Sequence, residues 1–242
     1  MKSFAAIFDV YGTLLMVGPP PPDADARWHH LFRDLLGTAP ALSRLEFSIA
    51  TNKVIARQHE EAHARGIAWP EVHWPSVASE VLPALTKLST QVLDEFLFRQ
   101  IQTGHTIRMT SETAAALRWF KERSFVLGIA SNAQAYTLRE LSEAMAVHAL
   151  GLELFERDLC FWSFEQGFSK PDPHVFQVLS ARLTARGLGP QKALMVGDRE
   201  DNDLAPARAF GWRAWQICAH SGEDGGEFGD WNQLIRRLRD QK

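Results

Sequence analysis

The chain has 242 residues, of which 45% are hydrophobic and 23% charged, and its formal net charge is −3. This balance is typical of an ordinary globular protein and gives no electrostatic reason to expect binding to nucleic acid or to an anionic membrane. The length allows one sizeable core with a smaller appended domain.

Segments that would direct the chain to a membrane or out of the cell are not evident. No apolar stretch approaches membrane-spanning length, and the N-terminus lacks the pattern of a secretory signal. The two cysteines, Cys160 and Cys218, lie in apolar segments, and we interpret them as reduced core residues rather than a disulfide. We therefore expect a cytoplasmic protein, either a monomer or a homodimer.

The first predicted strand ends in a carboxylate. Residues 5–8 are apolar, as in a strand buried on both faces of a parallel sheet, and Asp9 follows directly. Open α/β sheets bind ligands at the carboxyl ends of their strands. Gly12 allows a sharp turn, so Asp9 and Thr13 are predicted to face one space. The simpler interpretation of Asp9 is a helix N-cap.

The alternation of strands and helices is interrupted once. A proline-rich connector at residues 18–22 is followed by purely helical spacing of apolar residues over 24–102. Alternation resumes after about residue 109, where Ser111 and Thr113 are candidate helix caps. The spacing predicts strands over 125–130, 159–162, 193–197 and 213–217, and helices over 111–121, 135–145, 173–186 and 205–210. This order predicts an α/β fold with a parallel sheet and an inserted helical domain.

Polar groups follow the predicted strand ends and should meet at one edge of the sheet. They are Asp9, Ser131 with Asn132, Lys170, and Asp198 with Asp203. Each alone has an ordinary interpretation as a cap, a surface lysine or a solvated acidic loop. Together, two carboxylates, a lysine and small hydroxyl or amide donors form a site for a phosphate and a divalent cation such as Mg²⁺. We therefore expect a small anionic substrate.

Four motifs occur in order along the chain: Asp9-Val10-Tyr11-Gly12-Thr13, Ser131, Lys170-Pro171-Asp172-Pro173, and Gly197-Asp198 followed by Asn202-Asp203. This set resembles the motifs of the haloacid dehalogenase-like hydrolase superfamily. The resemblance implies a Rossmann-like core domain formed by residues 1–17 and 106–242. It also implies an α-helical cap domain at residues 18–105.

The resemblance also implies roles for individual residues. Asp9 is the nucleophile that forms a covalent intermediate, and Lys170 steadies it. Thr13 and Ser131 bind the transferred group, and Asn132 is expected to bind substrate with Ser131. Tyr11 is expected to be catalytic together with Asp9, Thr13 and Lys170. Magnesium is expected at Asp9, Tyr11, Asp198 and Asp203. A carboxylate nucleophile divides a difficult displacement into two steps, and fixed charges stabilise its transition state.

Tyr11 departs from the phosphatase pattern, which has a proton-donating aspartate at this position. Tyrosine, with a pKa of about 10, is a poor donor at neutral pH, and loss of a general acid removes a factor of about 10²–10⁴ in rate. The sequence at this motif is similar to that of 2-haloacid dehalogenases, whose halide leaving group needs no proton. His29 and His30 are alternative proton donors within the cap.

Asp198, in contrast, favours a phosphatase, because the 2-haloacid dehalogenases usually have serine at this position and use no metal. They also need an arginine for the substrate carboxylate, for which Arg27, Arg33 and Arg44 are candidates. We therefore expect a magnesium-dependent phosphatase acting on a small phosphorylated metabolite. The alternatives are a metal-independent 2-haloacid dehalogenase and a ligand-binding relative with feeble turnover. No motif in the cap identifies a substrate.

Overall fold

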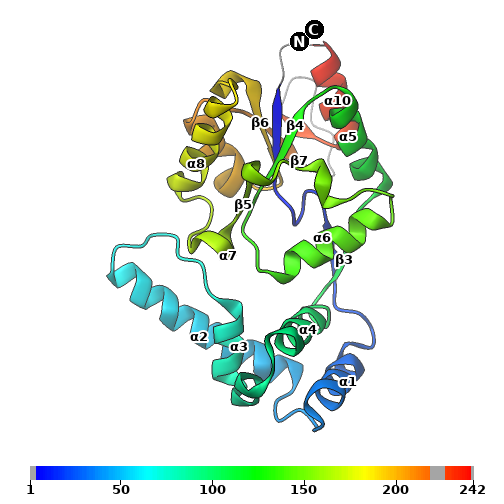
Figure 1. Ribbon diagram of the computed structural model, residues 1–242, viewed down its shortest axis with the longest axis vertical. Helices are drawn as coiled ribbons and strands as arrows, with labels where there is room; N and C mark the ends of the chain where they lie inside the picture. Colours follow the sequence, from blue (N-terminus) through cyan, green and yellow to red (C-terminus); the bar gives the residue numbers. More distant parts are fainter. Residues whose placement is uncertain (1–3, 219–226, 241–242) are drawn as a thin grey trace.

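The computed structural model describes residues 4–218 and 227–240. A parallel sheet of six strands forms its centre, in the order β5-β4-β1-β6-β7-β8 (Figure 1). The strands are β1 (Ala5–Phe8), β4 (Val126–Ser131), β5 (Cys160–Trp162), β6 (Ala193–Gly197), β7 (Arg213–Ile217) and β8 (Phe228–Gly229). Every residue of β1 is buried, as the apolar run before Asp9 predicts. The α/β fold expected from the sequence is confirmed.

Helices cover both faces of this sheet (Figure 1). One face packs against α5 (Ser111–Glu122), α6 (Tyr136–Ala146) and α10 (Trp231–Asp240), and the other against α8 (Pro173–Ala185) and α9 (Ala205–Ala209). A short helix, α7 (Ser163–Gln166), follows β5. Single turns of 3-10 helix occupy Pro83–Lys87, Leu152–Leu154, Arg157–Leu159 and Pro190–Lys192, and a π-helical turn spans Glu200–Leu204.

The helical insertion, which we define as residues 24–101, has a hydrophobic core of its own. It contains α1 (Ala24–Leu36), α2 (Arg44–Ala64), α3 (Trp74–Val81) and α4 (Thr90–Ile101). At the centre of this core is Trp28, whose ring packs against Phe32 and Phe47 at centroid distances of 4.8 and 5.2 Å. The Trp28 indole nitrogen donates to the carbonyl of Leu42 at 2.8 Å, which satisfies the buried polar group.

The two segments that connect the insertion to the sheet pair with each other. β2 (Met16–Gly18) and β3 (Thr106–Arg108) form an antiparallel ribbon. The sequence predicts only a proline-rich connector here, because three-residue strands carry little periodicity. The prediction of Ser111 and Thr113 as caps is also wrong: Thr110 is the N-cap of α5, and its hydroxyl accepts from Thr113 N at 3.1 Å.

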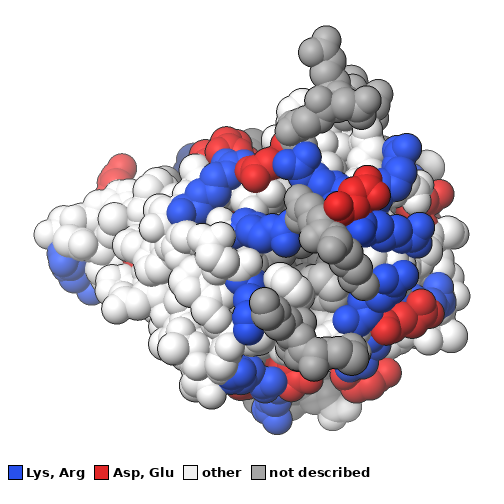
Figure 2. All heavy atoms as spheres, turned by 90° about the horizontal axis from the view of Figure 1, so that it is seen from above, with Lys and Arg blue, Asp and Glu red and all other residues white. Residues whose placement is uncertain are grey.

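The structure also bears on the cysteines, on membrane-spanning segments and on the distribution of surface charge. Cys160 and Cys218 are not joined by a disulfide, and both are only partly buried rather than core residues. None of the helices in the described ranges is both long and apolar enough to cross a bilayer. The face around the chain termini lies at the end of the molecule opposite the helical insertion, and on it Lys and Arg side chains are mixed with Asp and Glu (Figures 1 and 2).

Candidate active site

Three polar residues meet at the carboxyl edge of the sheet. Asp9 follows β1, Ser131 ends β4, and Asp198 follows β6. Because β4 and β6 are the two neighbours of β1, their ends lie side by side at one edge. This is where parallel α/β sheets bind ligands. The topology therefore brings together the residues that the sequence places at strand ends.

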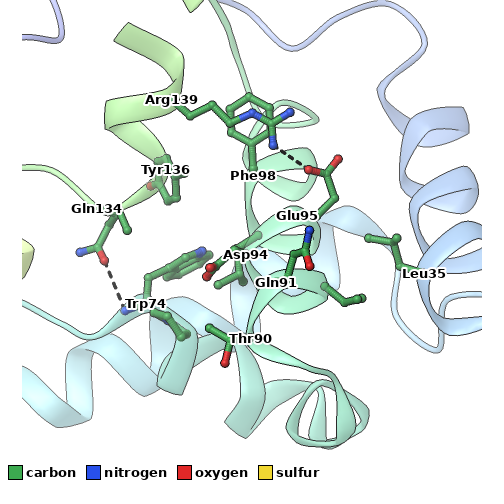
Figure 3. Close-up of a pocket in the computed structure, with 14 residues that line it drawn as sticks. Leu35, Trp74, Thr90, Gln91, Asp94, Glu95, Phe98, Gln134, Tyr136 and Arg139 are labelled. Carbon is green, nitrogen blue, oxygen red and sulfur yellow. Dashed lines mark hydrogen bonds and ion pairs between the residues drawn. The ribbon is translucent and has the colours of Figure 1, made fainter. Parts of the chain in front are cut away.

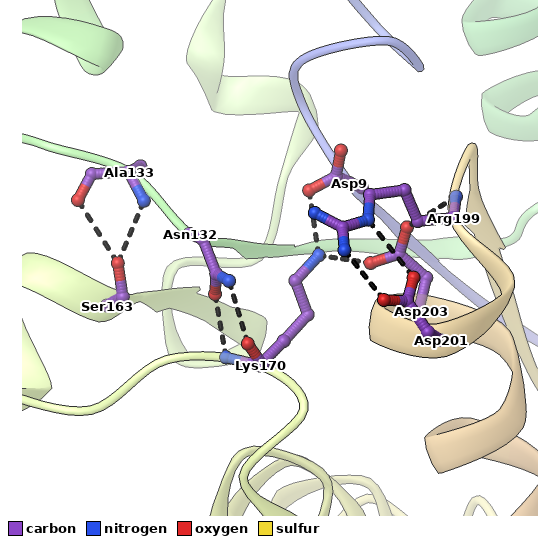
Figure 4. A network of polar contacts seen from close by, with 8 residues as sticks. All are labelled: Asp9, Asn132, Ala133, Ser163, Lys170, Arg199, Asp201 and Asp203. Atoms are coloured by element: carbon purple, nitrogen blue, oxygen red, sulfur yellow. Dashed lines mark hydrogen bonds and ion pairs between the residues drawn. The ribbon is translucent and has the colours of Figure 1, made fainter. Parts of the chain in front are cut away.

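Lys170 joins this edge from the loop before α8 and carries two ion pairs. Its ammonium group donates to Asp9 Oδ1 at 2.7 Å and to Asp203 Oδ1 at 2.5 Å (Figure 4). The lysine is only 3% exposed. Burial alone would lower the pKa of Lys170, but the two carboxylates outweigh burial and raise it above its ordinary value. Lys170 is therefore a fixed positive charge.

The two carboxylate oxygens of Asp9 differ in their contacts. Oδ1 accepts the bond from Lys170, whereas Oδ2 has no hydrogen-bond partner among the residues that the structure describes. The pKa of Asp9 is raised to about 6, because burial disfavours its charge and because Asp203 and Asp198 repel it against the attraction of Lys170. A further positive charge would favour the ionised, nucleophilic form.

The three carboxylates form a compact cluster. Ligand oxygens of Asp9, Asp198 and Asp203 all lie within 4.8 Å of one another. Gly12 has a φ of 80°, and a Cβ atom at this position would overlap with the carboxylate of Asp198. Glycine is therefore required here both by the backbone conformation and by the close approach of the acid. Clustered carboxylate oxygens match the ligand preference of Mg²⁺.

Asp203 is deeper in the site than Asp198 and has more bonds. It is 1% exposed, and its Oδ2 accepts from the main-chain nitrogen of Arg199 at 3.1 Å while Oδ1 accepts from Lys170. A Cβ atom at Gly197 would overlap with this carboxylate. Asp203 thus fixes the lysine and the loop after β6, and Asp198 lies nearer the open side.

Two buried hydroxyl groups have no partner within the described ranges. They are Thr13 Oγ1 and Ser131 Oγ, each on a residue that is 1% exposed. Buried hydroxyls are almost always hydrogen-bonded in proteins. Their position beside the acid cluster fits a bound group with several oxygen acceptors, such as a phosphoryl group.

Asn132 holds the loop that carries the lysine. Its Nδ2 donates to the carbonyl of Lys170 at 2.9 Å, and its Oδ1 accepts from the Lys170 main-chain nitrogen at 2.7 Å. Next to it, Ser163 Oγ bonds both main-chain groups of Ala133 at 2.8 and 3.1 Å (Figure 4). Both ends of the Asn132 amide are therefore engaged with the main chain of Lys170.

The hydroxyl of Tyr11 is bonded to helix α6. It donates to Glu140 Oε2 at 2.5 Å and lies 2.9 Å from Thr137 Oγ1. Burial of the phenol and the nearby charge of Glu140 both raise the pKa of Tyr11 above its ordinary value. The phenol is therefore a weaker acid than free tyrosine, and its proton is directed at Glu140.

The histidines and arginines of the insertion that the sequence suggests as site residues are exposed or form ion pairs with other residues. His29 and His30 are exposed on α1, and so is Arg33. Arg27 pairs with Asp23, and Arg44 pairs with Asp25. A different histidine joins the site network, because His105 Nε2 is 2.9 Å from Glu140 Oε1.

A cavity of about 980 Å³ lies between the helical insertion and the start of α6 (Figure 3). Trp74, Phe98 and Tyr136 contribute aromatic rings to its wall. The Gln134 amide crosses between the two parts: its Oε1 accepts from Trp74 N at 3.3 Å, and its Nε2 donates to Glu71 Oε1 at 2.9 Å. Asp9, Asp198 and Asp203 are not part of the lining of this cavity.

The site is therefore an acid–lysine cluster at the carboxyl edge of a parallel α/β sheet. A model of the family described as haloacid dehalogenase-like hydrolase matches residues 5–211. The chain therefore belongs to the haloacid dehalogenase-like hydrolase family.

Individual relatives include enzymes of both types considered above. A phosphoserine phosphatase of Thermus thermophilus is 35% identical over 104 residues, which are 43% of this chain and 38% of that protein. A 2-haloacid dehalogenase structure from Pseudomonas syringae aligns over 100% of both chains with a TM-score of 0.60 and 19% identity. A HAD phosphatase structure from Thermococcus onnurineus aligns over 97% of both chains with a TM-score of 0.55 and 19% identity. At this identity, the two structures demonstrate a shared fold.

Proposed function

We propose that this protein is a magnesium-dependent phosphatase that hydrolyses a small phosphorylated metabolite through Asp9. The observation that carries the proposal is the cluster of Asp9, Asp198 and Asp203 beside a single lysine. Three carboxylates and one ammonium group leave an excess of negative charge, which would repel an anionic substrate. A bound divalent cation removes that repulsion.

The donor set fits magnesium. Asp9 has an oxygen without a partner among the described residues, and Asp198 is only partly buried against Gly12. Tyr11 would contribute its main-chain carbonyl, because its hydroxyl is bonded to Glu140. Asp203 supports the ligands from behind. When bound, the metal neutralises these carboxylates and polarises the phosphoryl oxygens.

The residues of the chain then suffice for a two-step displacement. The free oxygen of Asp9 attacks phosphorus, the bond from phosphorus to the ester oxygen breaks, and the alcohol oxygen leaves with that electron pair and takes a proton from water. Water next attacks the acyl phosphate, which releases inorganic phosphate and restores Asp9. Lys170 holds Asp9 in place, while Thr13 and Ser131 donate to the phosphoryl oxygens.

We further propose that the helical insertion acts as a cap. It is joined to the core by the β2–β3 ribbon and by the Gln134 bridge to Glu71 and Trp74. Closure over the acid cluster would exclude water and bring substrate-selecting groups to the leaving group. The partial similarity to a phosphoserine phosphatase supports a small phosphate monoester as substrate.

Dehalogenation of a 2-haloacid is the second candidate, and Tyr11 is the observation that favours it. That reaction needs a cation for the substrate carboxylate. The three insertion arginines proposed for this task are exposed or paired with Asp23 and Asp25. The phosphatase assignment therefore accounts for more of the site.

Two assays decide between these functions. We expect magnesium-dependent release of phosphate from p-nitrophenyl phosphate, whose leaving group needs little protonation. Chloride release from 2-chloropropionate in the presence of EDTA, without phosphatase activity, would instead establish a dehalogenase. If neither substrate turns over but magnesium or inorganic phosphate raises the melting temperature, the protein is a binding relative.

A further inference from the structure

A buried carboxylate connects the nucleophile loop with the return linker of the helical insertion. Glu140 on α6 is 1% exposed. One of its oxygens accepts from the Tyr11 hydroxyl at 2.5 Å, and the other is 2.9 Å from His105 Nε2. Tyr11 is two residues beyond Asp9, and His105 directly precedes β3. Three segments that are distant in the sequence thus meet at one side chain.

We propose that Glu140 is a positioning residue for the reaction at Asp9, and that His105 links it to the position of the helical insertion. Glu140 fixes the rotamer of Tyr11, and through it the loop that carries the nucleophile. The effect of Glu140 on the reaction rate rests on the proposed function. The mechanical coupling from His105 to Tyr11 is independent of the reaction that the site catalyses.

The nucleophile loop is tight enough to transmit such a constraint. Gly12 N donates to Leu15 O at 2.8 Å, and Leu15 N donates to Val10 O at 2.8 Å, so residues 10–15 form a compact turn. Gly12 also contacts the Asp198 carboxylate, which leaves little room for displacement. A shift of the Tyr11 ring would therefore move the main chain beside both Asp9 and Asp198. Displacements of about 1 Å at a reacting group can lower a rate by about a hundredfold.

The same helix is connected to the insertion at a second point. Thr137 Oγ1 lies 2.9 Å from the Tyr11 hydroxyl and accepts from Gln134 N at 3.2 Å. The Gln134 side chain in turn bonds Glu71 and Trp74 of the insertion. The first turn of α6 and the residues before it therefore contact the insertion on one side and Tyr11 on the other. A rotation of the insertion about the β2–β3 ribbon would act on Tyr11 through both connections.

A kinetic series separates positioning from a structural or charge role. We expect Glu140→Leu and Tyr11→Phe each to lower kcat for p-nitrophenyl phosphate by about tenfold, the effect of losing one hydrogen bond to a charged group, with KM nearly unchanged. Glu140→Gln should keep most of the activity, because its amide oxygen can still accept from Tyr11 and its amide nitrogen can donate to a ring nitrogen of His105. Combining Tyr11→Phe with Glu140→Gln should add no further loss.

Glu143 supplies the matched control, since it lies three residues further along α6 and is exposed in a pair with Arg139. Glu143→Gln should leave kcat and KM unchanged. Unchanged kcat in both Glu140→Leu and Tyr11→Phe would contradict the positioning role. So would a Glu140→Gln variant that is as slow as Glu140→Leu, because that result would assign the effect to charge.

A spectroscopic measurement tests the coupling without any assay of activity. The chain has two tyrosines, so protein labelled with 3-fluorotyrosine gives two ¹⁹F resonances, and Tyr136→Phe identifies the signal of Tyr11. The His105 ring also lies edge-on to the Tyr11 ring at a centroid distance of 6.1 Å, so His105→Gln is measured both in wild type and in Glu140→Leu, where this ring contact remains but the connection through Glu140 is removed. We expect a larger shift of the Tyr11 resonance in the wild-type background, and no shift from Glu143→Gln. Equal shifts from His105→Gln in the two backgrounds would refute the coupling through Glu140, whatever reaction the site performs.

Discussion

One carboxylate oxygen of Asp9 is bound to the Lys170 ammonium group at 2.7 Å, while the other has no hydrogen-bond partner among the described residues. The ion pair fixes the direction of the carboxylate and leaves an oxygen free to attack. Asp9 is thus held by a buried cation rather than by backbone amides, which distinguishes it from a helix cap. The testable consequences concern this pair and the acids around it.

Replacing Lys170 should destabilise the fold. Lys170→Met would leave Asp9 and Asp203 buried without their common partner, and breaking a buried ion pair typically costs about 3–5 kcal/mol. We expect a loss of this order in urea denaturation at pH 7.5. The loss should shrink as the pH is lowered, because protonation removes the unpaired charges. Lys121→Met, a change in an exposed lysine, is the control.

Asp9 should make the metal-free protein less stable as the pH rises. Its pKa is raised from 3.8 to about 6 in the folded state, so between these values the folded protein retains a proton that the unfolded chain has lost. The free energy of unfolding therefore falls as the pH increases from about 4 to 6, by about 3 kcal/mol from this group. Wild type in EDTA should show this fall, and Asp9→Asn should show a smaller one, because Asp198, whose pKa is also raised by burial, still contributes.

Magnesium should oppose that effect at neutral pH. A cation between Asp9 and Asp198 favours both ionised carboxylates, so millimolar Mg²⁺ should raise the melting temperature of wild type at pH 7.5. In Asp198→Asn, the concentration of Mg²⁺ needed for half-maximal activity should rise at least about tenfold, as expected for loss of a charged ligand. Asp201→Asn tests specificity, since Asp201 is exposed and pairs with Arg199. Equal effects of the two variants would argue against the assigned site.

The phosphatase rate should depend strongly on the leaving group. The Tyr11 proton is directed at Glu140 and its pKa is raised, so wild type should hydrolyse p-nitrophenyl phosphate much faster than an alkyl phosphate. Tyr11→Asp supplies a carboxylic acid. It should reduce the ratio of the p-nitrophenyl phosphate rate to the alkyl phosphate rate by at least about tenfold, which is within the usual contribution of a general acid. The ratio is the informative quantity, because the variant also loses the bond to Glu140. An unchanged ratio would show that a missing proton donor is not the limitation.

The sheet and the strand-end residues could be predicted from the sequence for a physical reason. Buried parallel strands are continuous apolar runs, and polar residues that follow them must share one edge of the sheet. Asp9, Ser131 and Asp198 were identified in this way. Lys170 is in a loop near these strand ends rather than at the end of a strand, and the resemblance to the family motifs strengthens its inclusion.

The contacts made by helix α6 could not be predicted in the same way. Glu140 is on an amphipathic helix, where a glutamate ordinarily faces water, and its partner Tyr11 is 129 positions away. Its second partner, His105, has no distinguishing neighbours in the sequence. Pairings of this kind depend on how the insertion packs against the core, which local periodicity does not encode. The sequence singles out His29 and His30, which are exposed on α1, and gives no signal for His105, which contacts Glu140.

The central claim is that Asp9 forms a covalent acyl phosphate, and borohydride trapping tests it most directly. Reduction during turnover converts an acyl phosphate into an alcohol, so peptide mass spectrometry should find homoserine at position 9 only when both Mg²⁺ and p-nitrophenyl phosphate are present. Asp9→Asn should keep its fold by circular dichroism, lose turnover and show no modification. Turnover by wild type with Asp9 unmodified, together with an active Asp9→Asn variant, would contradict the account.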